Sequence, residues 1–387
     1  MKKSFIALAF GTLGLGMSEF AMMAILPDIA RSVNISIPQA GHFISVYALG
    51  VCVGAPLFAI VARKRPLKQI LMALILVYVI GNLSFAFCNT YWMLLVTRFI
   101  AGLPHGAYFG VGSIIADKLA DKGKGTAAVA AMVSGMTIAN LVGVPLGTFL
   151  SHNFSWNVTY ALIGLLGIAI MFAVRYWVPV LAALPDTGLK GQFKFLKYRE
   201  PWLLIFATML ANGGIFCWYS YVNPLMTDVS GFTAADMTGI MMCAGLGMVL
   251  GNLVSGHLSD RFTPERTATA IQGIVCIALV LIFYFAYSPW MSVGLMFMCT
   301  MCLFGLSAPE QILLLRNSKG GELLGAAMVQ VAFNLGNAIG AYSGGVAIDR
   351  NYGYESTALV GAGFAFIGFL LFFYFCIYSN KKQAALR

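Results

Sequence analysis

The sequence predicts an all-α integral membrane protein whose twelve transmembrane helices form two six-helix bundles, related by pseudo-twofold symmetry along the membrane normal. The first observation is composition, because hydrophobic residues make up 60% of the 387-residue chain and charged residues 10%. Soluble domains average roughly 45–50% and 25%. The second observation is that basic residues are concentrated in alternate loops. The third is a pattern of small residues that recurs in the second half of the chain.

Each apolar segment is long enough to cross a bilayer as a helix, which needs roughly 20 residues. A helix satisfies its own backbone hydrogen bonds in lipid, whereas a barrel would need short alternating segments that this sequence lacks. The first six predicted helices cover residues 4–27, 39–62, 69–88, 92–116, 126–150 and 158–178. The second six cover residues 201–226, 236–258, 267–287, 290–315, 323–348 and 356–379. The predicted domains are a first bundle at 1–178, a cytoplasmic linker at 179–200 and a second bundle at 201–387.

Lysine and arginine predict the orientation. With the N-terminus in the cytoplasm, 21 of the 24 basic residues fall in cytoplasmic segments, while Arg31 and Arg350 fall outside and Arg98 lies within a span. This bias follows the positive-inside rule and predicts an inner (plasma) membrane protein with both termini in the cytoplasm. The net charge of +10 therefore reports topology and not nucleic-acid binding. Because the basic residues are spread over several short segments, membrane lipids are their expected partners.

The two halves are related by an offset of 197 residues. Small residues and prolines recur at this offset, including Gly16 with Gly213, Pro27 with Pro224, Gly50 with Gly247, and Gly143 with Gly340. Parallel repeats of six helices indicate two bundles related by an axis along the membrane normal.

Three charged side chains lie well inside the apolar segments: Glu19, Arg98 and Glu310. A charge near the bilayer centre costs roughly 2.5–3.5 kcal/mol even on a lenient scale, so each is a candidate functional residue. The alternative is a buried pair that only holds helices together. Counted along their helices at about 1.5 Å per residue, Glu19 and Arg98 lie at about the same depth.

A buried carboxyl beside a guanidinium is balanced between two tendencies, because burial favours its protonated form and the positive neighbour favours its ionised form. Such a group can load and release a proton, which makes Glu19 the expected coupling acid and Arg98 its partner. His105 lies two turns beyond Arg98 and is either a proton relay or substrate contact, or a satisfied interior histidine. Glu310 follows Pro309 and could bind a cationic or hydroxyl-bearing substrate, or pair with Arg316.

A polar and aromatic set is expected to line the substrate cavity, since aromatic faces with amide and hydroxyl groups suit sugars and amphipathic organic molecules. Besides Glu310, its predicted members are Tyr47, Asn140, Asn212, Trp218, Tyr221, Gln330 and Asn334. For any single aromatic residue, packing or lipid contact is the competing interpretation.

Several of these residues fall in longer motifs. The first helix contains Ser18-Glu19-Phe20 and Leu26-Pro27-Asp28-Ile29-Ala30, the fourth Arg98-x-x-x-Gly102-x-x-His105, and the fifth Asn140-x-x-Gly143-Val-Pro145-Leu-Gly147. Over the whole chain these motifs resemble the major facilitator superfamily, in particular its drug:proton antiporter branch with arabinose-efflux-permease-like and sugar efflux transporters. The resemblance implies a gating role for Gly143, Pro145 and Gly147 in the fifth helix.

The superfamily's loop signature, G-x-L-x-D-R, is well matched once. It reads Gly256-His-Leu-Ser-Asp260-Arg261 between helices eight and nine, whereas Arg63-Lys64 stands at the Asp-Arg position between helices two and three. The resemblance implies that Asp260 and Arg261 make charge contacts that hold the inner gate. Simple positive-inside anchoring is the alternative.

Taken together, the resemblance implies a monomeric secondary active transporter that exports small organic compounds (drugs, sugars or related metabolites) by proton-coupled alternating access. We expect no cofactor and no metal site. The sequence has no Walker-type phosphate loop for direct ATP drive. It also has no intramembrane nucleophile–base pair that would predict an enzyme. A facilitator or proton symporter with the same fold, and a non-transporting membrane sensor, are the alternatives.

Overall fold

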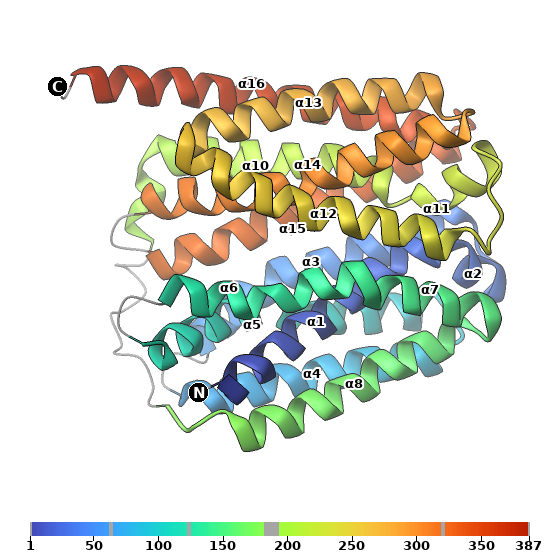
Figure 1. Ribbon diagram of the computed structural model, residues 1–387. Coiled ribbons are helices and arrows are strands. Elements are labelled where there is room, and N and C mark those ends of the chain that lie inside the picture. The colour runs from blue at the N-terminus through green and yellow to red at the C-terminus, as the bar shows by residue number, and fades with distance from the viewer. Residues whose placement is uncertain (1, 62–64, 122–124, 182–192, 319–321, 386–387) are drawn as a thin grey trace. The chain divides into compact units, whose positions relative to one another are not determined.

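The computed structural model describes residues 2–61, 65–121, 125–181, 193–318 and 322–385 (Figure 1). Among these residues, eleven helices are long and apolar enough to cross a membrane. Together with the 28-residue helix α15 (Glu322–Asp349), they match the twelve predicted segments in order. The predicted all-helical membrane fold is therefore confirmed.

The helices group into two compact units. Unit 1 comprises Met1–Gly188 with Ala234–Met242, and unit 2 comprises Leu189–Thr233 with Cys243–Arg387. Before residue 188 the chain forms α1 (Lys2–Ala24), α2 (Leu26–Ser32), α3 (Ile37–Val61), α4 (Leu67–Phe87), α5 (Tyr91–Leu119), α6 (Gly125–Ile138), the π-helical turn η1 (Ala139–Gly143), α7 (Val144–Asn153) and α8 (Trp156–Trp177). Of the predicted linker, residues 182–192 lie outside the described part of the chain.

The second half of the chain begins with the short 3₁₀ turn η2. The elements in order are η2 (Lys194–Lys197), α10 (Arg199–Tyr219), α11 (Val222–Pro224), the π-helical turn η3 (Leu225–Val229), α12 (Met237–Arg261), α13 (Pro264–Phe285), α14 (Pro289–Arg316), α15 and α16 (Ser356–Ala385). Each predicted span is thus represented, with boundaries shifted by a few residues.

The first helix of each half is broken shortly before a proline. Ile25, between α1 and α2, has φ −117° and ψ 15°, and it precedes Pro27 by two residues. Tyr221, between α10 and α11, has φ −116° and ψ 20°, and it precedes Pro224 by three. Proline has no N–H to donate to the carbonyl four residues earlier, and its ring clashes with that carbonyl, so a helix breaks within the turn before a proline. The same irregularity therefore recurs close to the predicted offset.

Small residues bring the first and fifth helices of each half close together. A Cβ added at Gly16 would lie 2.8 Å from the Cβ of Ala139, and one added at Gly213 would lie 3.1 Å from the carbonyl oxygen of Gly336. The two pairs are related by the same 197-residue offset at both positions. Small side chains at such contacts allow helix backbones to approach, as is common in membrane bundles.

We predict that Gly340→Ala destabilises unit 2. A Cβ at Gly340 would overlap the carbonyl oxygen of Gly213 and lie 2.9 Å from the amide nitrogen of Cys217, so α10 and α15 would have to separate. Overpacking of this kind costs about 1–3 kcal/mol, which should appear as a lower thermal unfolding midpoint of the detergent-purified protein.

Gly363→Ala is the matched control, because a Cβ at Gly363 meets nothing within 4 Å. Since alanine favours a helix over glycine, this variant should unfold at the wild-type temperature or slightly above it. Equal midpoints for the two variants would contradict the close-packing explanation.

Candidate functional site

A buried polar cluster in unit 1 joins three helices. It contains Glu19 of α1, Tyr47 of α3, and Arg98 and His105 of α5; Glu19 is 4% exposed, and Arg98 and His105 are each 1% exposed. Helices α3 and α5 can approach closely because a Cβ at Gly102 would overlap the carbonyl oxygen of Tyr47. The glycine therefore brings the Tyr47 ring over the part of α5 that carries the two basic residues.

His105 lies between a carboxylate and a phenol. Its Nε2 is 3.7 Å from Oε2 of Glu19, and its Nδ1 is 2.9 Å from the hydroxyl of Tyr47. The ring also stacks on Phe109, with centroids 5.4 Å apart. With the proton on Nε2, the imidazole presents N–H to Glu19 and accepts a hydrogen bond from Tyr47 at Nδ1. This arrangement brings together the two titratable groups that the sequence predicts for proton coupling.

Arg98 contacts the helix turn that carries Glu19. Its Nη1 donates to the carbonyl oxygen of Ser18 at 3.1 Å, and its guanidinium carbon lies 4.2 Å from the ring centroid of Tyr47. The rings of Phe85 and Tyr160 are each 5.5 Å away. A guanidinium is planar and always charged, so it both stacks on aromatic rings and adds a fixed positive charge to the cluster.

Ser18 and Asn82 are site residues that the sequence reasoning missed. The Ser18 hydroxyl donates to Oδ1 of Asn82 at 2.7 Å, and Asn82 donates from Nδ2 to the carbonyl oxygen of Tyr78 at 2.9 Å. Both side chains are neutral, so no charge marked them in the sequence. Their hydrogen bonds connect α1 to α4 and fix the turn on which Glu19 sits.

The third intramembrane acid, Glu310 of α14, lies in unit 2. It is 2% exposed, and Nδ2 of Asn212 on α10 donates to its two carboxyl oxygens at 3.2 and 3.4 Å. Arg316, the alternative partner considered from the sequence, is exposed at the end of α14. Within the described residues, Glu310 is therefore held by a neutral amide.

The remaining residues expected to line a cavity are divided between the units, with Asn140 in unit 1 and the others in unit 2. Asn140 and Asn334 each donate from Nδ2 to the carbonyl oxygen four residues earlier, at 3.0 Å. The Tyr221 hydroxyl donates to the carbonyl oxygen of Ala341 at 2.7 Å. Trp218 is fully buried, and its Nε1 has no hydrogen-bond partner in the described part of the chain. Gln330 is half-buried on α15.

The expected gating residues of the fifth helix occupy the π-helical turn and its exit. Pro145 stands in the first turn of α7, where its missing N–H releases a carbonyl from regular helical bonding and favours the wider turn. A Cβ at Gly143 would lie 2.6 Å from Cγ of Met17 on α1, and one at Gly147 would lie 3.1 Å from Cγ2 of Thr159 on α8. The fifth helix is thus irregular next to its close contacts with α1 and α8.

Of the two charged residues of the loop signature, Arg261 has a described side chain. It is exposed, with its guanidinium carbon 5.5 Å from the ring centroid of Phe262. The side chain of Asp260, and residues Arg63 and Lys64, lie outside the described part of the structure. The gating role of Asp260 and Arg261 stays a prediction.

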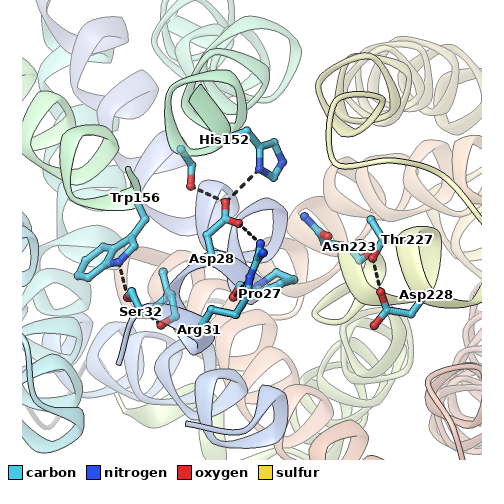
Figure 2. Close-up of polar contacts among 11 residues, drawn as sticks. Pro27, Asp28, Arg31, Ser32, His152, Trp156, Asn223, Thr227 and Asp228 are labelled. Carbon is cyan, nitrogen blue, oxygen red and sulfur yellow. Dashed lines mark hydrogen bonds and ion pairs between the residues drawn. The ribbon is translucent and has the colours of Figure 1, made fainter. Parts of the chain in front are cut away.

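A second polar network of unit 1 is centred on Asp28 in α2 (Figure 2). Its carboxylate accepts a hydrogen bond from the Ser151 hydroxyl at 2.6 Å, lies 3.2 Å from Nδ1 of His152, and pairs with Nη2 of Arg31 at 2.7 Å. Burial opposes ionisation of Asp28, but the contacts with His152, Ser151 and Arg31 leave its pKa below the ordinary value of 3.8. In the sequence, the only signal for this network is weak, an acid directly after Pro27.

The network fastens α2 to the helices beside it. Ser151 and His152 lie in the last turn of α7, and nearby Nε1 of Trp156, the first residue of α8, donates to the Ser32 hydroxyl at 2.6 Å (Figure 2). Because α2 is a separate short helix after the break at Ile25, these contacts hold its position. Sequence reasoning did not find them, since they depend on which helix ends meet.

Comparison with known proteins shows which family this chain resembles. A sequence model of the Major Facilitator Superfamily matches residues 8–328. The putative transporter AraJ of Escherichia coli (strain K12) is 49% identical over 384 residues, covering 99% of this chain and 98% of AraJ. A probable sugar efflux transporter of Pasteurella multocida (strain Pm70) is 26% identical, covering 92% of this chain and 87% of the relative. The crystal structure of a mutant of the nucleoside transporter NupG has the same fold, with a TM-score of 0.78 at 12% identity, covering 96% of this chain and 98% of NupG.

We predict that Asp28→Asn lowers stability in a pH-dependent way. Hydrogen bonds to a charged group contribute about 1.5–3 kcal/mol, and the variant should lose this much near neutral pH. Because the pKa of Asp28 is lowered in the folded protein, its contribution is full above the ordinary value of 3.8 and fades as the pH falls below it. Thermal unfolding of both proteins across this range measures the difference.

Asp228→Asn is the control, because Asp228 is exposed and, among the described residues, accepts one hydrogen bond, from the Thr227 hydroxyl at 2.8 Å (Figure 2). Its effect should be small at every pH. A loss in Asp28→Asn that persists unchanged below the ordinary pKa would refute the charge explanation.

Proposed function

Because this chain belongs to the Major Facilitator Superfamily, we propose that it is a secondary active transporter that exports small organic compounds in exchange for protons. The chain is a multi-pass membrane protein whose relatives are transporters and not enzymes. Drugs, sugars and related metabolites are the proposed substrate class, supported by the relative described as a probable sugar efflux transporter. Polar and aromatic side chains such as Tyr47, Asn140 and Trp218 suit such compounds.

One observation carries the proposal: the buried contact between Glu19 and His105, with Arg98 bound to the adjacent Ser18. A fixed guanidinium charge balances one carboxylate, so the cluster tolerates an ionised Glu19 in the apolar interior. Adding a proton to either Glu19 or His105 leaves one net positive charge there. A charge in that environment is costly, which makes the cluster sensitive to whether water and protons can reach it.

The proposed cycle uses this sensitivity. A proton enters the cluster from the side of high proton concentration, neutralises Glu19 and weakens its contact with His105. Alternating access then exposes the cluster to the other side, where the proton leaves and Arg98 again balances an ionised Glu19. Each proton that crosses in this way releases about 2.3 kcal/mol per 100 mV of membrane potential. His105, hydrogen-bonded to Tyr47, is the proposed relay for the proton.

The proposal also covers how the helical bundles are arranged in the membrane and which parts move. The two six-helix bundles at 1–178 and 201–387 act as the moving parts, joined by the 179–200 linker, in a monomer. The protein lies in the inner membrane with both termini in the cytoplasm, supported by the distribution of its basic residues, which contact membrane lipids. The irregular turn at Gly143 and Pro145, together with Arg261 and Asp260, is proposed to gate the movement.

We predict that Glu19→Gln abolishes proton coupling. Purified protein is reconstituted in liposomes that contain a pH-sensitive dye, and a panel of sugars and of cationic and neutral drugs is added. The wild type should move protons when substrate is present. The rate of proton flux in the variant should be at least about tenfold lower, because glutamine cannot carry the proton. The direction of proton flux relative to substrate distinguishes export by exchange from symport.

Glu265→Gln is the matched control, the same substitution in the first turn of α13, and it should keep the wild-type rate. Substrate movement without protons, equal in wild type and Glu19→Gln, would contradict proton coupling and make the protein a facilitator.

A further inference from the structure

Glu310 and Glu19 are both buried, but their partners differ. Glu19 has an imidazole beside it and a guanidinium bonded to the preceding residue, so unit 1 supplies its own positive group, Arg98. Within the described residues of unit 2, the hydrogen bonds of Glu310 come from the neutral amide of Asn212. An ionised carboxylate in an apolar interior needs a positive partner. None of the hydrogen bonds that the described residues give Glu310 supplies a positive charge.

The orientation of the Asn212 amide is fixed by its own helix. Nδ2 donates to the carbonyl oxygen of Thr208 at 2.9 Å as well as to Glu310, so both of its hydrogens are used. The amide oxygen, Oδ1, then remains as an acceptor that neither of these hydrogen bonds uses. Asn212 is 0% exposed, and its Oδ1 has no hydrogen-bond partner in the described part of the chain. A buried carbonyl without a donor is costly, typically about 1–3 kcal/mol, so this oxygen marks a place for a donor.

Asn334 of α15 repeats the arrangement. Its Nδ2 is bonded to the carbonyl oxygen of Gln330, and its buried Oδ1 is also without a partner among the described residues. Asn212 and Asn334 flank the close contact of Gly213 with Gly336, where α10 and α15 meet. Helices α10, α14 and α15 pack against one another, so two unused amide acceptors lie on helices that adjoin the one carrying Glu310.

We propose that Glu310 and Asn212 bind the protonated amine of the transported compound, so that the cargo of this protein includes organic ammonium ions. This inference rests on the proposed transport function and names a substrate class for it. An ammonium carries three donors and one positive charge, which match the carboxylate and the free amide oxygen together. A bare proton would neutralise Glu310 but leave Oδ1 of Asn212 unpaired, and a neutral sugar hydroxyl would not supply the charge.

The test is a binding comparison between two probes that differ in charge. Monodansylcadaverine is a fluorescent primary amine, and its N-acetyl derivative is neutral and nearly the same size. With the purified full-length protein in detergent, the wild type should bind the amine at least about tenfold more tightly. Glu310→Gln should remove this preference by weakening amine binding alone, and Asn212→Leu should reduce it. Glu265→Gln, the matched control in α13, should bind both probes as the wild type does.

Size-exclusion chromatography would reveal a variant that does not fold. A second measurement, made on the wild type alone, keeps the proposal testable in that case. A carbodiimide that modifies buried carboxyl groups should label Glu310. The amine should leave the peptide carrying Glu310 unmodified, with neither the carbodiimide nor the dansyl amine attached, while the acetylated probe should not. Equal affinity for the two probes, an unchanged preference in Glu310→Gln, equal protection by both probes, or no binding of the amine would each overturn the proposal.

This experiment is independent of proton coupling, since it needs neither a membrane nor a gradient. A protein that moves no protons in liposomes can still prefer the amine, and a proton-coupled exporter can lack the preference. The two proposals therefore fail separately.

Discussion

The cost of placing charge inside an apolar helical bundle is the constraint on which the rest of this structure depends. Lipid and packed side chains do not solvate an ion, so each buried charge has to be balanced by another group of the protein or by something that enters. In unit 1 the balance is internal, because Arg98 stacks on Tyr47 and bonds to Ser18 while His105 faces Glu19. In unit 2 the balance of Glu310 is incomplete, with one amide as its hydrogen-bond donor in the described residues.

That constraint explains why the small residues matter for function and not for packing alone. Arg98 can stack on Tyr47 only if α3 and α5 are close, and their approach requires that Gly102 carry no side chain against the Tyr47 carbonyl. In the same way, Gly213 and Gly336 bring α10 and α15 together beside the two asparagines. A side chain at such a position would separate the helices and lengthen the contacts that balance the charges. The contacts that balance the buried charges therefore depend on the close approach of the helix backbones.

The sequence was sufficient for the architecture and for choosing the buried acids, but not for their partners. Helix number and order follow from the length and apolar character of the segments, and the breaks before Pro27 and Pro224 follow from proline chemistry. The prediction that Glu19, Arg98 and His105 belong together rested on depth and spacing along two helices. Ser18 and Asn82 were missed because a neutral side chain gives no signal until its neighbours are known. The Asp28 network was missed for a related reason, since it depends on how the ends of α2, α7 and α8 meet.

In the proposed exchange of cargo for protons, the two buried acids have different tasks. A carboxylate that the protein itself neutralises is stable when ionised. Protonating it leaves the charge of Arg98 unbalanced, so its proton occupancy depends on whether water reaches the cluster. A carboxylate without a built-in cation is stable only when a positive species occupies it, so its occupancy is tied to the arrival of that species. If a cationic cargo binds Glu310 as a proton leaves Glu19, the total buried charge of the chain is unchanged. Exchange then avoids the intermediate in which both acids are ionised inside the bundles and only one has a positive partner. Conservation of buried charge is thus a sufficient physical reason for cargo and proton to replace one another.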